Sequence, residues 1–502
     1  MHKEDVDKKT DSHDLSVKQV RLNFVVGDVS SFDPHDLHTG GREGALGKWL
    51  FEGLTRLNPQ GEYELAGAAD MNVSACQTRY TFTVRPSHYS NGELVSAYDY
   101  EQCWKRAIAP GSKCANAHLF YCIKNAEAAK KGDMPIDSVG VKAVDKTTLI
   151  VDLEQPTSYF LKLLSSHLFA PFKIEKGQIL FGGPYRVEER KEDDYLLLGK
   201  NPYFWDHSQV AIEKIKIFMV CDPIVALSLY EEGDIDWIGD PFSYLPSEVL
   251  STELSKGNLF QGPEIVFPYW VYLNTETFPL SSPLIRKALY YTVNQKEIAD
   301  YLFIGDKPLF SPFPFSTHED IAESYDLEKG REFFEQGLKD LGLTKDTFPA
   351  LKLTSSSTTI HKRLAQCLQE TWHHAFGITV DLEVQDWNTF FANMSKGAYQ
   401  IGGFFTSINY NDPVACLEVL SNENNFSKWH CAQYQKIVDK LKCVDNIQVR
   451  ESLLKEAEAI LKQEFPIIWV VNRIPYHRYP SNLKGLCFDS SGIPDFRWAY
   501  FD

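Results

Sequence analysis

The side chains in this sequence that could bind a metal ion fall into two small groups. His361, His373 and His374 lie on or near one predicted helix, and Asp234, Asp236 and Asp240 form a short acidic run. Adjacent residues on a helix point about 100° apart, so His373 and His374 do not form a clamp by themselves. The acidic run lacks the twelve-residue pattern of a calcium loop. We therefore predict no metal site, with the histidines in ordinary surface or core positions and the acids solvated or capping.

The motifs that supply common catalytic chemistry do not occur in this sequence. It has no Gly-x-x-x-x-Gly-Lys-Ser/Thr loop for phosphates and no Gly-x-Gly-x-x-Gly turn for dinucleotides. His-Glu-x-x-His, which places two imidazoles on zinc, and Gly-x-Ser-x-Gly, which exposes a nucleophile, are also missing. We therefore predict that the protein is not an enzyme and uses no cofactor.

Charge and cysteine content limit the partners of the chain. The net charge is −17 and no long basic run is present to meet phosphates, so we expect no nucleic-acid binding. None of the 10 cysteines stands in a Cys-x-x-Cys pair, which removes the usual support for zinc-ribbon and thioredoxin-type sites. Buried free thiols are the expected state, with disulfides as the alternative in an oxidising compartment. No apolar run reaches the ~18–20 residues that span a bilayer.

The N-terminal segment, residues 1–18, is polar and rich in Lys and Asp. Such a segment cannot bury a core, so we expect a flexible tail. Two interpretations fit it. Either a cytoplasmic protein begins here, or a signal or lipid-anchor segment has been removed from a secreted protein and Met1 added for expression.

Strands and helices alternate along the rest of the chain, and these elements must position any site. The expected elements are strand 215–220, helix 223–232 and strand 234–237; strand 351–353, helix 360–376 and strand 378–384; and helix 450–462 followed by strand 465–471. A strand–helix–strand unit favours a parallel pair with a helical crossover. Ser282-Pro283 is typical of a helix start, and residues 80–84 alternate like a half-exposed strand before a turn at 87–97. The sequence predicts a mixed α/β architecture of several layers.

Seven segments carry a family resemblance through their order and spacing. They are residues 32–35 (FDPH), 50–54 (LFEGL), 80–85 (YTFTVR) with 89–99 (YSNGELVSAYD), 201–205 (NPYFW), 232–236 (EGDID), 360–364 (IHKRL) and 409–413 (NYNDP). In this set the chain resembles the large extracytoplasmic solute-binding proteins of ABC peptide importers, family 5, of the oligopeptide-binding type. The resemblance runs from about residue 20 to the C-terminus.

The resemblance implies a two-lobed α/β fold, like the type II periplasmic binding proteins of the large peptide-binding group, whose lobes close around a ligand by hinge motion. After the tail 1–18, one lobe would combine residues 19–57, 172–266 and 476–502, an accessory third domain would cover 58–171, and the second lobe would cover 267–475.

The resemblance also implies which residues meet the ligand. An extended peptide would lie between the lobes and pair with them through backbone hydrogen bonds as an added strand. Trp387 and Trp270 fall where the family has aromatic pocket walls, and His361 falls where a side chain reaches the C-terminal end of the ligand. One edge that pairs with the peptide would be His38, Thr39 and Gly40, and the facing strand would be Phe404, Phe405, Thr406 and Ser407. The remaining contacts would be Asn409, Tyr410 and Asp240.

The sequence departs from the family at charged positions. The aspartate that meets the α-ammonium of the peptide in the family is Asn409 here, and a neutral amide loses charge assistance worth roughly 1 kcal/mol. The family has two arginines that meet ligand carboxylates, and their positions are occupied here by Met394 and Gly403. The positions of its cysteine pair are occupied by Phe267 and Ser407. Asp412 would replace the missing charge if the loop were shifted.

These features together predict the ligand-capturing subunit of an ABC importer, which takes up oligopeptides and delivers them to the transmembrane permease. The protein is expected to be a monomer in the periplasm or another extracytoplasmic space, with a lipid anchor, if any, upstream of residue 1. The first alternative keeps the fold and changes the ligand to a dipeptide, a glutathione-like modified peptide, a sugar, or a nickel or other metal chelate. A peptide hydrolase, which would need an activated nucleophile or metal site, and a peptide-holding chaperone are alternatives of other classes.

Overall fold

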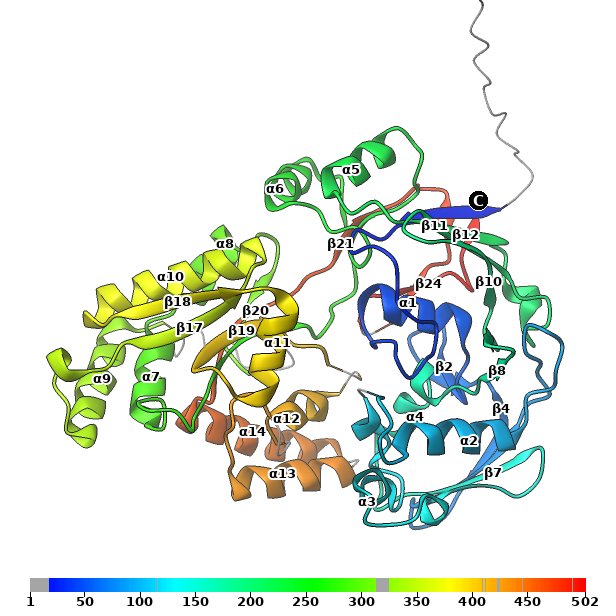
Figure 1. Ribbon diagram of the computed structural model, residues 1–502, viewed down its shortest axis with the longest axis horizontal. Helices are drawn as coiled ribbons and strands as arrows, with labels where there is room; N and C mark the ends of the chain where they lie inside the picture. The colour runs from blue at the N-terminus through cyan, green and yellow to red at the C-terminus, as the bar shows by residue number, and fades with distance from the viewer. Residues whose placement is uncertain are drawn as a thin grey trace, which may run out of the picture.

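The computed structural model describes residues 18–114, 116–312, 325–408, 410, 412–421, 425–444, 446–489 and 491–502, so the predicted tail lies almost wholly outside the described residues. Figure 1 shows two bodies side by side, one built on a six-stranded sheet and the other on several smaller sheets. The chain passes between them twice, at residues 262–267 and 473–475. These crossing segments run together, because Gly262 N–H donates to Pro475 O at 2.8 Å and Arg473 N–H to Phe267 O at 3.1 Å.

The first body has a mixed sheet in the order β16-β20-β15-β19-β17-β18, in which β17 pairs in parallel with β18 and β19. Its strands are β15 (Pro268–Leu273), β16 (Lys307–Pro308), β17 (Leu351–Ser356), β18 (Val380–Gln385), β19 (Ile401–Phe405) and β20 (Ile467–Asn472). Every residue of β15 and β20 is buried, as expected for central strands with helices over both faces. The helices are α7 (Pro283–Tyr291), α8 (Gln295–Tyr301), α9 (Leu327–Leu341), α10 (Thr359–Phe376), α11 (Trp387–Lys396), α12 (Pro413–Ser421), α13 (Ala432–Cys443) and α14 (Ile447–Glu464).

The second body holds two four-stranded sheets and a three-stranded one. The first is β1 (Gln19–Asn23), β12 (Lys214–Phe218), β11 (Tyr195–Lys200) and β10 (Tyr185–Lys191), in that order. The second is β4 (Ala68–Val73), β5 (Arg79–Val84), β7 (Thr148–Asp152) and β6 (Val141–Ala143), and the third is β13 (Ile238–Gly239), β21 (Tyr476–Arg478) and β14 (Phe260–Gln261). Short pairs complete it: β2 (Thr55–Leu57) with β3 (Tyr63–Leu65), β8 (Lys173–Glu175) with β9 (Gln178–Leu180), β22 (Leu483–Lys484) with β25 (Tyr500–Phe501), and β23 (Cys487–Phe488) with β24 (Pro494–Asp495).

The helices of the second body are α1 (Gly41–Leu50), α2 (Ala97–Ile108), α3 (Ala126–Lys131), α4 (Phe160–Leu163), α5 (Pro223–Glu231) and α6 (Ser247–Lys256). α2 begins at Ala97, because Ser96 and Asp99 form a capping box just before it, and it packs on β6 and β7. α1 lies near the middle of this body (Figure 1), with Trp49 fully buried and its indole N–H donating to Pro494 O.

One predicted strand is wrong. Residues 234–237 are not a strand; β13 begins at Ile238 and pairs with β21 in another sheet, so α5 does not connect two parallel neighbours. Asp236 does lie beside β1, and its N–H donates to Arg21 O at 2.7 Å. Its carboxylate, however, accepts the Arg21 N–H at 2.8 Å and the Arg21 guanidinium at 2.7 Å. A side chain therefore takes the bond that a strand carbonyl would take, and the parallel partner of β12 is β1.

The other predicted elements agree with the structure. β17, α10 and β18 form the predicted strand–helix–strand unit, and Gly377 ends α10 in the left-handed conformation with φ of 75°. The sheets of the two bodies draw their strands from separate stretches, since the six-stranded sheet uses only residues 268–472. The predicted division into lobes and an accessory domain stays a prediction.

Candidate ligand-binding groove

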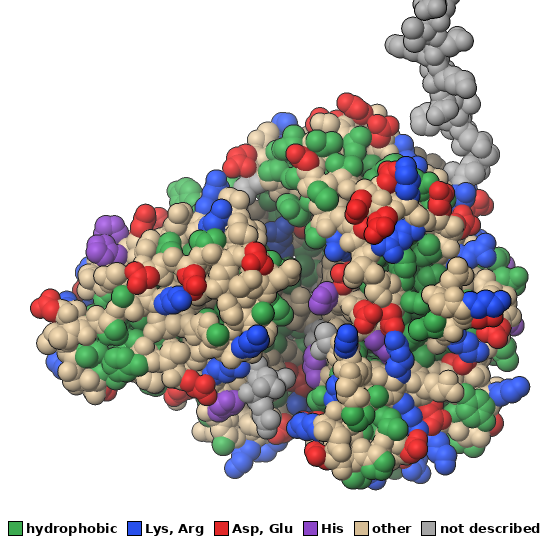
Figure 2. Space-filling view, viewed as in Figure 1, with side chains coloured by type: hydrophobic (Ala, Val, Ile, Leu, Met, Phe, Trp, Pro, Cys, Tyr) green, Lys and Arg blue, Asp and Glu red, His purple; other side chains and the backbone are tan. Residues whose placement is uncertain are grey.

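A groove runs between the two bodies and is visible in Figure 2. Two predicted ligand-pairing segments, one from each body, approach each other closely. Gly40 is the N-cap of α1, and Ser407 is an exposed residue just after β19. A Cβ atom built on Gly40 would lie 4.0 Å from Ser407 Oγ. The fold therefore brings together residues that are far apart in the sequence.

The neighbours of Gly40 are held in place locally. His38 is exposed, and its backbone N–H donates to Glu43 Oε2 at 2.8 Å in the first turn of α1. Thr39 is half-buried between them. On the other side, the Thr406 N–H donates to Pro268 O at 2.8 Å and its hydroxyl lies 2.7 Å from the Tyr272 hydroxyl, so the chain after β19 stays on the sheet edge.

Aromatic side chains form one wall of the first body, which we name the aromatic wall. Trp387, at the start of α11, is 44% exposed and stacks on Phe391 one turn later, with ring centroids 5.7 Å apart. Phe404 supports both rings edge-on, and Phe426 packs against it at 5.1 Å. An exposed aromatic pair with a buried support suits an apolar or aromatic side chain of a ligand. Phe391 and Phe426 were not predicted, although the four-residue spacing of Trp387 and Phe391 on one helix is a signal for such a pair.

His361 lies behind this wall, in the first turn of α10. Its Nδ1 is 2.7 Å from Ser356 Oγ, its ring meets Tyr269 edge-on at 5.3 Å, and the Trp387 ring is 6.2 Å away. Burial lowers its pKa to about 4. The imidazole is therefore neutral near pH 7 and offers a ligand carboxylate a hydrogen bond at most. Its predicted contact with the ligand stays a prediction.

Two residues that were predicted to contact the ligand are buried inside the protein. Trp270 is fully buried in the central strand β15, opposite Phe404 on one side and Trp469 on the other. Tyr410 is buried against Tyr159 of the second body, with rings stacked at 4.3 Å. Asn409 lies outside the described residues.

The positions of the two missing arginines are filled by packed side chains. Met394 is fully buried, and a Cβ on Gly402 would lie 2.5 Å from its Sδ. A Cβ on Gly403 would lie 2.9 Å from the Tyr269 ring and 3.0 Å from Val271. The Tyr269 hydroxyl donates to Gly403 O at 2.8 Å. Tyr269, Val271 and Met394 thus fill the space around these two positions.

A half-buried charge cluster lies where the chain crosses between the bodies. The Arg473 guanidinium pairs with Asp240 at 3.1 Å and lies 3.8 Å from Asp306. It also lies over the Phe405 ring, 5.8 Å from its centroid, and Phe405 stacks on Phe267. Burial raises the pKa of Asp306 to about 7. Asp240 was predicted, but Arg473 and Asp306 were missed, because nothing in their spacing shows that they meet.

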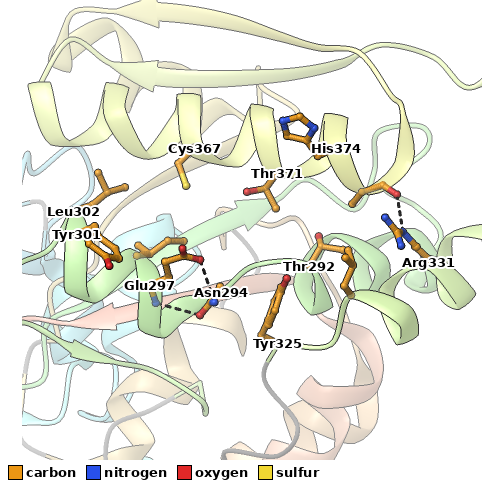
Figure 3. Close-up of a pocket in the computed structure, with 13 residues that line it drawn as sticks. Thr292, Asn294, Glu297, Tyr301, Leu302, Tyr325, Arg331, Cys367, Thr371 and His374 are labelled. Atoms are coloured by element: carbon orange, nitrogen blue, oxygen red, sulfur yellow. Dashed lines mark hydrogen bonds between the residues drawn. The ribbon is translucent and has the colours of Figure 1, made fainter.

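A second hollow, of about 450 Å³, lies wholly within the first body. Figure 3 shows its lining from α8, α9 and α10, with Tyr301 and Tyr325 on one side and Cys367, Thr371 and His374 on the other. The Glu297 carboxylate accepts from the Asn294 amide at 3.2 Å. Because only one body lines it, this hollow is separate from the groove.

The described residues include free cysteines but neither a metal-binding cluster nor a membrane-spanning helix. All ten cysteines are described and each is a free thiol. Within the described ranges, no group of three or more His, Cys, Asp or Glu side chains is arranged to hold a metal ion. Among those same residues, no helix has the length and apolar character to cross a membrane.

Two α/β bodies, joined by two adjacent crossing segments and lined with aromatic residues at the groove between them, are typical of binding proteins that close on a small ligand. The chain matches the bacterial extracellular solute-binding proteins, family 5, middle region, over residues 62–428. The chain belongs to this family.

Known proteins are similar along nearly the whole chain. The oligopeptide-binding protein OppA of Bacillus subtilis is 33% identical over 497 residues, which cover 93% of this chain and 91% of that protein. Haemophilus influenzae OppA, solved in complex with the peptide RPPGFSPFR, shares the fold with a TM-score of 0.83 at 20% identity, covering 97% of this chain and 99% of that one.

The murein tripeptide-binding protein MppA of Escherichia coli is a further structural neighbour, at 23% identity and 97% coverage of this chain in each of two structures. These cover 99% and 98% of the MppA chain. The TM-score is 0.84 for one structure and 0.74 for the unliganded open form. The chain as a whole is thus less similar to that open form than to the other MppA structure.

Proposed function

We propose that this protein is the extracytoplasmic ligand-capturing subunit of an ABC importer and that its ligands are oligopeptides, which it holds in the groove and delivers to the transmembrane permease. The observation that carries the proposal is the approach of the Gly40 and Ser407 segments from opposite bodies beside the aromatic wall. Two backbone edges with a nearby aromatic surface suit an extended peptide, since the edges bond to its main chain and the wall receives a side chain.

The proposal also covers how the ends of the ligand are held. No arginine stands at positions 394 and 403, and the imidazole of His361 is neutral. Arg473, half-buried beside Phe405, is already paired with Asp240. Contacts to the main chain therefore contribute more to affinity than contacts to terminal charges, and peptides with blocked ends should bind nearly as well as free ones.

The remaining features of the proposal follow from this role. The protein works as a monomer in the periplasm or another extracytoplasmic space and performs no catalysis. The absence from the sequence of phosphate-loop, dinucleotide and nucleophile-elbow motifs supports a binding role.

Mass spectrometry of the molecules released when natively purified protein is denatured tests the proposal. Peptides of several lengths should be recovered, and isothermal titration with the same peptides should show one site per chain. Recovery of only non-peptide molecules would contradict the peptide part of the proposal.

A further inference from the structure

A second contact joins the two bodies at the end of the groove remote from the crossing segments. In Figure 1, β21 and the crossings lie at the upper end of the groove, and α12–α14 approach α3 and α4 at the lower end. There the rings of Tyr159 and Tyr410, from opposite bodies, stack with centroids 4.3 Å apart and planes 13° apart. Both hydroxyls donate to one carboxylate, that of Glu418 in α12: Tyr159 at 3.2 Å to Oε1, and Tyr410 to Oε2.

Ionic and backbone contacts surround the stacked rings. Asp412 accepts from Arg450 at 2.5 Å within the first body, and Lys162 of α4 in the second body lies 3.5 Å from its other oxygen. The Ser158 N–H donates to Lys442 O at 3.2 Å, and Arg450 lies 3.4 Å from Ser158 Oγ. These three contacts of Ser158 and Lys162 cross between the bodies. We name Ser158, Tyr159, Lys162, Tyr410, Asp412 and Glu418 the closure contact.

The closure contact can exist only when the bodies are close. Rotation about the crossing segments moves the opposite end of the groove furthest, so opening separates Tyr159 from Tyr410 before it disturbs either sheet. The lower similarity of the whole chain to the open form of MppA than to its other structure agrees with a closed state.

The contact also bears on the ligand-pairing segment. Ser407, which faces Gly40, and Tyr410 and Asp412, which face the second body, belong to the single loop between β19 and α12. Asp412 additionally accepts the Val414 N–H at 3.0 Å and so fixes the start of α12. Closing therefore clamps one end of this loop while its other end lies at the groove.

We propose that the closure contact is a latch that stabilises the closed state and orients Tyr410 and Asp412, so that Tyr159, Tyr410 and Glu418 are positioning residues for ligand retention. The proposal rests on the proposed capture of a ligand between the bodies. A latch acts on the closed complex and not on the encounter, so its loss should raise the ligand dissociation rate and leave the association rate nearly unchanged.

Tyr159→Phe and Tyr159→Ala test the latch, with the nonapeptide RPPGFSPFR as the probe. Tyr159→Phe keeps the stacked ring and loses the bond to Glu418, whereas Tyr159→Ala loses both. We expect the dissociation rate to rise about threefold and about tenfold, respectively, where tenfold corresponds to 1.4 kcal/mol. Tyr195→Phe is the matched control, because it removes a tyrosine–glutamate bond (2.6 Å to Glu189) between β11 and β10, within the second body.

Two measurements without ligand separate this proposal from the proposed function. Small-angle X-ray scattering of the unliganded protein should show a larger radius of gyration for Tyr159→Ala than for the wild type. Hydrogen exchange should be faster at the Ser158 amide and unchanged in β15. If the wild type does not bind the nonapeptide, the peptide proposal is weakened and these two measurements alone decide on the latch. A folded Tyr159→Ala protein with wild-type scattering and exchange, or a Tyr195→Phe protein with the same dissociation rate as Tyr159→Phe, would overturn it.

Discussion

At the scale of single residues, the buried carboxyl group of Asp306, where the chain crosses between the bodies, lowers the stability of the folded protein when it is ionised. One of its carboxylate oxygens accepts the Ile474 N–H at 3.0 Å, and the other is buried without a hydrogen bond, 3.8 Å from Arg473. Burial outweighs the attraction of Arg473 and raises the pKa to about 7. Ionisation of the carboxyl group in this position therefore makes the free energy of folding less favourable.

Replacing Asp306 by Asn should stabilise the protein at alkaline pH. The folded pKa is above the unfolded value of 3.8, so the folded state binds more protons between about pH 4 and 7 and wild-type stability falls as pH rises through this window. Asn keeps an acceptor for Ile474 and has no charge to desolvate. We expect a gain of about 2 kcal/mol at pH 8 and little change at pH 4.5, measured by urea unfolding. Asp381→Asn, on an exposed part of β18, is the control and should show no such pH dependence.

Trp387 and Trp270, both predicted to contact the ligand, should behave oppositely on truncation. Trp387→Ala removes an exposed ring, so it should lower peptide affinity about tenfold with less than about 1 kcal/mol of lost stability. Trp270→Ala removes a fully buried ring from β15 and should cost about 3–5 kcal/mol. Titration calorimetry and urea unfolding separate the two effects. Equal loss of stability in both variants would contradict this assignment of the aromatic wall.

At the scale of elements, β19 is packed too closely for an arginine at position 403, where the family resemblance places one. Gly403 pairs with Val271, and its Cα faces the Tyr269 ring and the Val271 methyl group. Gly403→Ala should therefore destabilise the protein by about 1–3 kcal/mol, since both neighbours lie in a buried strand and cannot yield easily. Gly182→Ala is a suitable control, because the nearest atom to its Cβ would be 4.0 Å away. An unchanged urea midpoint for Gly403→Ala would show that the sheet relaxes around it.

The elements that the sequence predicted best are those whose pattern and caps agree. α10 combines apolar residues every four positions with Gly377 at its end, and β17 and β18 flank it as expected. The prediction of strand 234–237 failed because alternation along the chain does not show that Asp236 bonds to Arg21, which is 215 residues away. Arg473 and Asp306 were missed for the same reason, since only the folded chain brings them together.

The predicted ligand-binding residues also depended on contacts that only the folded chain shows. Trp387 and the 404–407 segment were located through the family resemblance. Trp387 is 44% exposed and Ser407 approaches Gly40 of the other body, while their contact with a ligand stays a prediction. Trp270 was placed on a wall, but β15 is buried on both faces and has no exposed side. Tyr410 was predicted as a ligand contact, yet its partners are Tyr159 and Glu418. Position in a known family indicates the neighbourhood of a residue; which way its side chain points depends on the local packing.

At the scale of the whole molecule, buried neutral histidines are spread over both bodies and make the fold sensitive to acid. His35, His167, His361 and His477 all have their pKa lowered to about 4, in each case mainly by burial. Their unfolded pKa is 6.5. The stability that these groups contribute is complete above pH 6.5 and is lost as the pH falls toward about 4, because the unfolded state binds the protons first.

Urea unfolding at pH 7, 5.5 and 4.5 should therefore show stability falling steeply across this window. Each buried histidine adds a slope of up to about 1.4 kcal/mol per pH unit. His361→Gln tests one contribution, because glutamine can still bond to Ser356 but does not titrate, and it should make the decline shallower by about that amount. His207→Asn, at an exposed histidine, should leave the slope unchanged. A decline that His361→Gln does not alter would mean that acid acts on other groups, such as paired carboxylates, whose depressed pKa values place their effect at lower pH.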